Sequence, residues 1–199
     1  NLLGGEQSGH IADVGFDLYM RMVGEAVNDY KTGIIDKEEE SHECKVELPV
    51  NAHLAESYVP GERLRLDLYR RLADVAKPED VQSIREELLD RFGELPEEAV
   101  ALLAVAQLRA LAKSLGIREV VATGKFLRLS PISLPESRQL RLARLYPGSI
   151  YKGPTNTALV TLPKNPAWNP SNPTAEIVDT SLLTWVTEVV DQLTKASTT

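Results

Sequence analysis

The spacing of the apolar residues changes along the chain, and this change limits the fold more than any other feature. Between about 61 and 116, apolar residues recur every three or four positions, as they do in amphipathic helices. On either side they alternate with polar residues, which is typical of strands. The two kinds of segment follow one another irregularly. We therefore predict an α+β fold, with a small sheet packed against several helices.

Prolines and glycines mark the helix boundaries in the central region. We predict three helices here, over 61–76, 78–92 and 96–116. Pro78 and Pro96 each stand at a first turn and are followed by acidic residues, which favour a helix N-terminus. Gly93 and Gly116 each follow a last turn, where a left-handed backbone conformation commonly ends the helix.

The other predicted elements are shorter. Residues 43–50 alternate as a strand, and Pro49 cannot donate to a neighbouring strand, so we place it at a sheet edge. The rest are a β-hairpin of 117–122 and 126–129, a helix over 135–146, a strand over 157–162 and a helix over 175–195. Prolines and asparagines predict a loop over 163–174.

The first 42 residues have a different character from the rest. An amphipathic helix is predicted over 13–31, followed by an acidic linker over 32–42. We expect the apolar stripe of this helix to fold back on residues 43–199 or to mediate self-association, through Leu18, Met22 and Val27.

Charge is unevenly distributed along the chain, which has a net charge of −7. Residues 118–152 carry 7 basic and 2 acidic side chains, whereas residues 1–50 carry 4 and 11. An acidic chain is a poor candidate for strong DNA binding on its own, because each neutralised phosphate needs a Lys or Arg. The basic stripe of Arg138, Arg141 and Arg144 keeps open an alternative function, in which residues 118–152 form a DNA-contacting module or dock on an acidic neighbour.

Motifs for catalysis and metal binding are missing from the sequence. Thr123-Gly124-Lys125-Phe126 lacks the first glycine and the hydroxyl of a phosphate-binding loop, and no nucleophile elbow or zinc-protease motif occurs. Cys44 has too few soft ligands near it for zinc and no obvious group to activate its thiol. We therefore predict no catalytic residue, no metal and no cofactor. The longest apolar run, Ala99–Ala106, is too short to cross a membrane, and we expect a cytoplasmic protein.

Several short motifs resemble one family when they are taken together in this order. They are Leu2–Gly9 (LLGGEQSG), Val14–Tyr19 (VGFDLY), Val46–Pro49 (VELP), Leu68–Ala73 (LYRRLA), Glu87–Pro96 (ELLDRFGELP) and Leu115–Arg118 (LGIR). The chain is similar in these motifs to the C-terminal part of the bacterial transcription-repair coupling factor family. The resemblance is dense over 1–120 and weaker afterwards.

The resemblance implies a role for the first motif. In that family it closes a translocation motif shared with the RecG helicase, and its glutamine, Gln7 here, helps couple ATP hydrolysis to movement on double-stranded DNA. The chain would then be a fragment without either ATPase domain, and not an enzyme by itself. The full-length protein would use ATP and Mg²⁺, displace stalled RNA polymerase and recruit UvrA.

The resemblance also implies that residues 43–199 are a regulatory domain. In the family this domain packs on an N-terminal UvrB-like module of the same protein and hides the surface that UvrA binds. The contact residues correspond to Glu87, Asp90 and Arg91, on the predicted helix 78–92. That helix has a net charge of −3, so its acidic face is suited to arginines on a partner.

Overall fold

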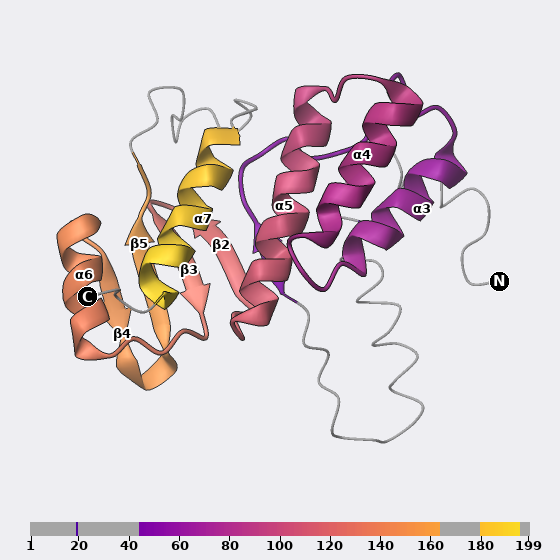
Figure 1. Cartoon of the computed structure of the whole chain (residues 1–199). Coiled ribbons are helices and arrows are strands. Elements are labelled where there is room, and N and C mark those ends of the chain that lie inside the picture. The colour runs from indigo at the N-terminus through magenta and orange to yellow at the C-terminus, as the bar shows by residue number, and fades with distance from the viewer. Residues whose placement is uncertain (1–18, 20–43, 164–179, 196–199) are drawn as a thin grey trace, which may run out of the picture. The chain divides into compact units, whose positions relative to one another are not determined.

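A computed structural model describes Tyr19 and residues 44–163 and 180–195 (Figure 1). Gln7, the linker 32–42, most of the loop 163–174 and all of the predicted helix 13–31 except Tyr19 lie outside these residues. The predicted boundary between residues 42 and 43 therefore stays a prediction.

The chain divides into two compact units. The first comprises residues 1–42 and 51–107, and the second comprises residues 43–50 and 108–199. The division falls within helix α5 (Glu97–Ser114), after Gln107. The region that looks like one domain in the sequence therefore contains two packing units, each with its own buried residues.

The first unit contains helices α3 (Glu62–Ala73) and α4 (Asp80–Phe92) and the first part of α5. All three predicted helices of this region are confirmed, with boundaries shifted by at most three residues. Gly93 follows α4 with a φ of 83°, as its predicted capping role requires. The helices bury one apolar face each, which includes Leu68, Tyr69 and Leu72 on α3 and Val81, Ile84 and Leu88 on α4.

The segment between residues 51 and 61 is fastened to α3 by buried polar contacts. The backbone N–H of Leu54 donates to the Tyr69 hydroxyl at 2.8 Å, and Arg65 Nη1 donates to the Val59 carbonyl at 3.0 Å. Both bonds are buried, so losing either would leave a polar group without its bond inside the unit.

Tyr19 contacts the same helix. Its ring centroid lies 5.9 Å from that of Tyr69, and burial raises the pKa of its hydroxyl, with a further contribution from Asp74. This contact agrees with the expectation that the N-terminal segment folds back on residues 43–199. Leu18, Met22 and Val27, through which we expected the contact, lie outside the described residues.

The second unit is built on a five-stranded mixed sheet with the order β1-β2-β3-β5-β4. Its strands are β1 (Lys45–Glu47), β2 (Glu119–Thr123), β3 (Phe126–Ser130), β4 (Ile150–Lys152) and β5 (Thr157–Thr161). Among the described residues β1 pairs with β2 alone, in parallel, and the other pairs are antiparallel. The predicted edge position of this strand is therefore confirmed, but the strand is shorter than the predicted 43–50 and ends before Pro49. The sequence did not predict β4, because Pro147-Gly148 and Gly153-Pro154 flank it closely and leave too few residues to show alternation.

One face of this sheet forms the core of the second unit. The side chains of Val120, Leu127, Leu129, Ala158 and Val160 are fully buried. Helix α7 (Thr180–Thr194) lies across the strands in Figure 1 and buries Val186, Val189 and Leu193. Helix α6 (Glu136–Leu145) contacts α7, and the rings of Tyr146 and Trp185 meet edge to face at 5.8 Å. The α+β fold class is confirmed.

Within the described ranges no helix is long and apolar enough to span a bilayer.

Candidate interaction surface on helices α3 and α4

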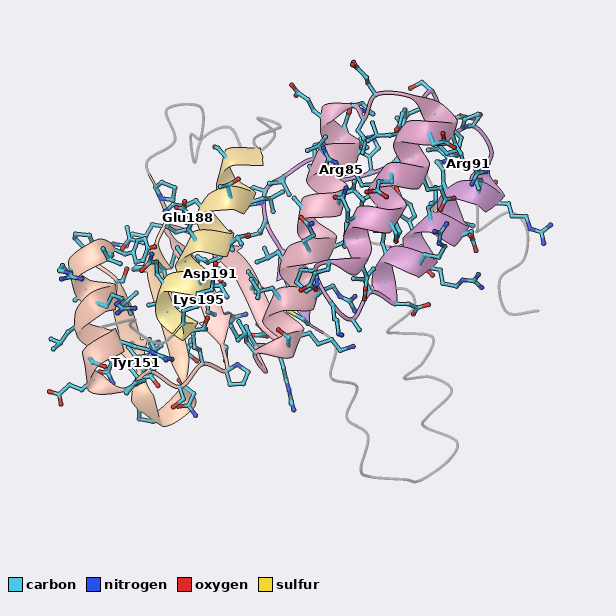
Figure 2. The ribbon with its side chains drawn as sticks, viewed as in Figure 1. Arg85, Arg91, Tyr151, Glu188, Asp191 and Lys195 are labelled. Carbon is cyan, nitrogen blue, oxygen red and sulfur yellow. The ribbon has the colours of Figure 1, made fainter. Side chains whose placement is uncertain are left out.

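The three residues that the sequence singled out on α4 lie toward its C-terminal end. Glu87, Asp90 and Arg91 occupy the last two turns of the helix, and Figure 2 shows Arg91 at that end. The buried face of α4 is formed by Val81, Ile84 and Leu88, so the three residues lie outside it. Three and four residues apart, they share one region of the helix surface.

Glu87 makes two ion pairs, and they come from two different helices. Arg71 Nη2 on α3 lies 2.6 Å from Glu87 Oε2, and Arg91 Nη1 lies 2.7 Å from Glu87 Oε1. The side chain of Glu87 is 26% exposed, compared with 37% for Arg71 and 44% for Arg91. The expected acidic contact residue is therefore already paired with two arginines of its own chain.

The pKa of Glu87 reflects these pairs. The hydrogen bond from Arg71 is the main reason that it is lowered from the ordinary value of 4.5. Burial opposes this effect, and the hydrogen bond from Arg91 adds to it. The same contact with Glu87 raises the pKa of Arg71. Glu87 is thus held ionised at neutral pH.

Arg91 also lies near an aromatic ring. Its guanidinium carbon lies 5.1 Å from the centre of the Phe92 ring, and that ring meets Tyr58 edge to face at 5.9 Å. The Tyr58 hydroxyl is within hydrogen-bond distance of the carbonyls of Leu88 (3.3 Å) and Gly93 (3.0 Å). Tyr58 therefore stabilises the C-terminal end of α4, which carries Arg91.

Asp90 differs from Glu87 and Arg91, the other two residues of the predicted trio. It is exposed, and within the part of the chain that the structure describes its carboxylate has no hydrogen-bond or ion-pair partner. Leu89 beside it is 41% exposed. Asp90 is thus the acid of the predicted trio that is available to a partner.

The basic stripe in the second unit is used in a different way. Arg141 Nη1 donates to the backbone carbonyl of Gln192 on α7 at 3.1 Å, and Arg138 is half-buried, whereas Arg144 is exposed. Elsewhere in residues 118–152, Arg128 pairs with Glu119 at 3.3 Å. The stripe does not present three equivalent charges to solvent.

Cys44 is buried in the second unit, and burial raises the pKa of its thiol to about 11. Arg109, whose Nε donates to the Cys44 carbonyl at 3.3 Å, and Lys113 oppose this rise without cancelling it. The sequence had shown no basic group beside Cys44 apart from its near neighbours, and folding brings these two close. The thiol nevertheless stays protonated at neutral pH. Among the described residues no group of three His, Cys, Asp or Glu side chains is placed to hold a metal ion.

Sequence reasoning missed two residues of this surface. Arg71 lies within the motif Leu68–Ala73 and Tyr58 lies before it, and the role of each depends on what packs beside α4. No local pattern shows that Arg71, rather than Arg70, reaches Glu87.

Comparison with known proteins identifies the family. A family model described as "TRCF domain" matches residues 48–139. The curated transcription-repair-coupling factor of Mycobacterium bovis is 46% identical over 82% of this chain, and that of Staphylococcus haemolyticus is 35% identical over 73%. The chain belongs to the transcription-repair coupling factor family.

The chain corresponds to the C-terminal domain of these factors. It spans only 14% and 12% of the length of the two curated relatives. A solved structure titled as the C-terminal domain of transcription-repair coupling factor matches with a TM-score of 0.55, over 76% of this chain and 94% of that chain. The two are 14% identical in sequence, so this match establishes the shared fold.

The segment that matches the transcription-repair coupling factor family model contains one of the two charged surfaces and only the beginning of the other. Residues 48–139 include Arg71 and the Glu87, Asp90 and Arg91 trio. Arg141 and Arg144 lie beyond it. The surface on α3 and α4 is thus part of the family domain, and most of the basic stripe is not.

Proposed function

We propose that this chain is the interaction domain with which a transcription-repair coupling factor holds its own UvrB-like module and hides that module's UvrA-binding surface. The observation that carries this proposal is the ordered cluster of Arg71, Glu87, Asp90 and Arg91 inside the matched family domain. A cluster with fixed geometry favours a specific protein contact over a general attraction of charges.

The exposure of this surface suits reversible contact. Arg71, Glu87 and Arg91 remain between 26% and 44% exposed, so their interactions with a partner are screened by salt and individually weak. A weak contact that acts within one protein still closes it, because the tethered partner has a high effective concentration. Such a contact opens when a stronger partner competes.

The wider activity belongs to the whole protein in this proposal. It would hydrolyse ATP with Mg²⁺, move on double-stranded DNA, displace stalled RNA polymerase and recruit UvrA in the cytoplasm. Gln7 would couple hydrolysis to movement, and this chain would add no catalytic group of its own.

The DNA-contacting alternative is less well supported by the charges of the second unit. Arg141 is bonded to α7 and Arg128 to Glu119, so fewer cations are available to phosphates than the count over 118–152 indicates. The chain is also acidic, with a net charge of −7.

UvrA affinity of the full-length protein tests the proposal. Replacing Glu87 and Asp90 together by Ala should raise the fraction of open molecules and thereby the affinity. The double substitution should weaken this partly exposed contact surface by about 0.5–2 kcal/mol, which corresponds to a roughly two- to thirtyfold increase. The increase should shrink at high salt, where the contacts are already screened in the unchanged protein.

The matched control removes two other acids from the same region. Glu86→Ala with Glu94→Ala takes the same charge from exposed positions and should leave UvrA affinity within twofold. An unchanged affinity in the folded Glu87/Asp90 variant at low salt would refute the proposal.

A further inference from the structure

Both carboxylate oxygens of Glu87 are occupied, and this changes what a partner can contact. Oε2 accepts from Arg71 at 2.6 Å and Oε1 accepts from Arg91 at 2.7 Å. A partner arginine would have to share these oxygens with two groups already bound. Glu87 is thus better placed to hold its neighbours than to receive a new cation.

Arg71 is the one member of this cluster that lies on α3. Glu87 and Arg91 are four residues apart on α4, and such a pair on an exposed helix surface is weak and flexible by itself. The bond from Arg71 fixes the Glu87 carboxylate from the neighbouring helix, and the guanidinium of Arg91 also lies over the ring of Phe92. The direction of Arg91 therefore depends on Arg71 through Glu87.

The four charged side chains of this cluster carry two positive and two negative charges. Arg71 and Arg91 share the single carboxylate of Glu87, while Asp90 beside them has no partner among the described residues. A complementary surface would place a basic group opposite Asp90 and an acidic group opposite Arg91. This pattern is more specific than the uniform acidic face suggested by the net charge of the helix.

We propose that Arg71 is a positioning residue of the interaction surface: it fixes Glu87 and thereby Arg91, so that Asp90 and Arg91 meet a partner surface of alternating charge. This inference rests on the proposed function for the identity of the partner, the UvrB-like module. To that function it adds that Asp90 and Arg91 make the contact and that Arg71 positions Arg91.

The first test uses the chain by itself. The carboxyl carbon of Glu87 is followed by NMR during a pH titration of the unchanged chain, Arg71→Gln and Arg70→Gln. Arg70 is the matched control, because it is the adjacent arginine of α3 and pairs with Asp67 instead, at 2.6 Å. Arg71→Gln should raise the pKa of Glu87 toward its ordinary value, and Arg70→Gln should leave it unchanged. Equal behaviour of the two variants would overturn the inference.

The second test uses UvrA affinity of the full-length protein and asks whether Arg71 acts through Glu87. Arg71→Gln should raise the affinity about two- to tenfold, and Arg70→Gln by less than twofold. In a Glu87→Gln background, Arg71→Gln should raise the affinity no further. In the otherwise unchanged protein, Arg71→Lys should raise the affinity less than Arg71→Gln, because the lysine keeps a positive charge beside Glu87. A full additional effect of Arg71→Gln in that background would mean that Arg71 touches the partner directly, which contradicts a positioning role.

The two failures are distinguishable. If the Glu87 and Asp90 double variant leaves UvrA affinity unchanged, the proposed function and its partner chemistry fail together. If that variant acts as expected while Arg71→Gln leaves both the Glu87 pKa and the affinity unchanged, only the inference about Arg71 fails. Thermal unfolding of each variant confirms that it is folded before either result is used.

Discussion

The surface on α3 and α4 and the basic stripe on α6 look alike in the sequence, since both are short helical runs of charge. In the structure they differ. Arg71 on α3 and Arg91 on α4 both pair with Glu87, and Asp90 beside them is exposed. On α6, Arg141 bonds to the backbone of α7, so part of the stripe serves packing within its own unit.

This difference shows that the partner of a charged side chain decides its role more than its spacing does. A charge paired with a neighbouring side chain still presents a patterned surface to other proteins. A charge bonded to a backbone carbonyl fastens one element to another. The following predictions test this distinction, from the largest expected effect to the smallest.

The largest effect is expected from the apolar side of α6. Leu142 is 2% exposed and Leu140 is 68% exposed on the same helix. Leu142→Ala should lower the free energy of unfolding by about 2–5 kcal/mol, because it leaves a cavity. Leu140→Ala, the matched control, should change it by less than about 0.5 kcal/mol. Denaturant unfolding measures both, and a comparable loss in the two variants would contradict the packing of α6.

A smaller effect is expected at Glu87. Glu87→Gln should lower the free energy of unfolding by about 1–2 kcal/mol at pH 7, because two charge-assisted bonds are weakened. The pKa of Glu87 is lowered in the folded chain, so its contribution is fully present above the ordinary value of 4.5 and is lost as pH falls through the folded value. Unfolding curves for both proteins at pH 7 and in acid should therefore converge. A difference that persists unchanged in acid would exclude ionisation of Glu87 as its source.

Arg141 should contribute to stability and Arg144 should not. Arg141→Gln removes the bond to the Gln192 carbonyl and should cost about 0.5–1.5 kcal/mol. Arg144→Gln removes the same charge from an exposed position of α6 and should cost less than about 0.5 kcal/mol. Equal unfolding free energies of the two variants would show that the stripe has no role in joining α6 to α7.

The weakest effect is expected in DNA binding by the chain. The logarithm of the binding constant should fall with the logarithm of salt concentration with a slope shallower than about −2, because few cations are available to phosphates. Replacing Arg138, Arg141 and Arg144 together by Gln should change this slope by less than about 1. Fluorescence anisotropy with a short duplex provides the measurement. A steep slope that the triple variant abolishes would support the DNA-contacting alternative.

The sequence predicted the elements whose signals are local. Pro96 and Gly116 bracket α5 closely, because these residues restrict the backbone wherever they occur. The strand before Pro49 was predicted from the alternation of its side chains, and it ends at Glu47, two residues before that proline. The hairpin of β2 and β3 was also predictable, since Gly124 has a φ of 59° in the two-residue turn that joins them. The α+β class followed from these elements together.

The tertiary structure alone decided how the charges are used. No spacing rule distinguishes Arg71 from Arg70, yet one reaches Glu87 on α4 and the other pairs with Asp67 on its own helix. The same holds for Tyr58, which supports the end of α4, and for Arg141, which binds α7. Helix propensity and capping depend on residues within one turn, whereas an ion pair across a helix seam depends on which faces the buried apolar residues bring together. The sequence therefore determined most of the elements and the family, and packing determined which charges remain for a partner.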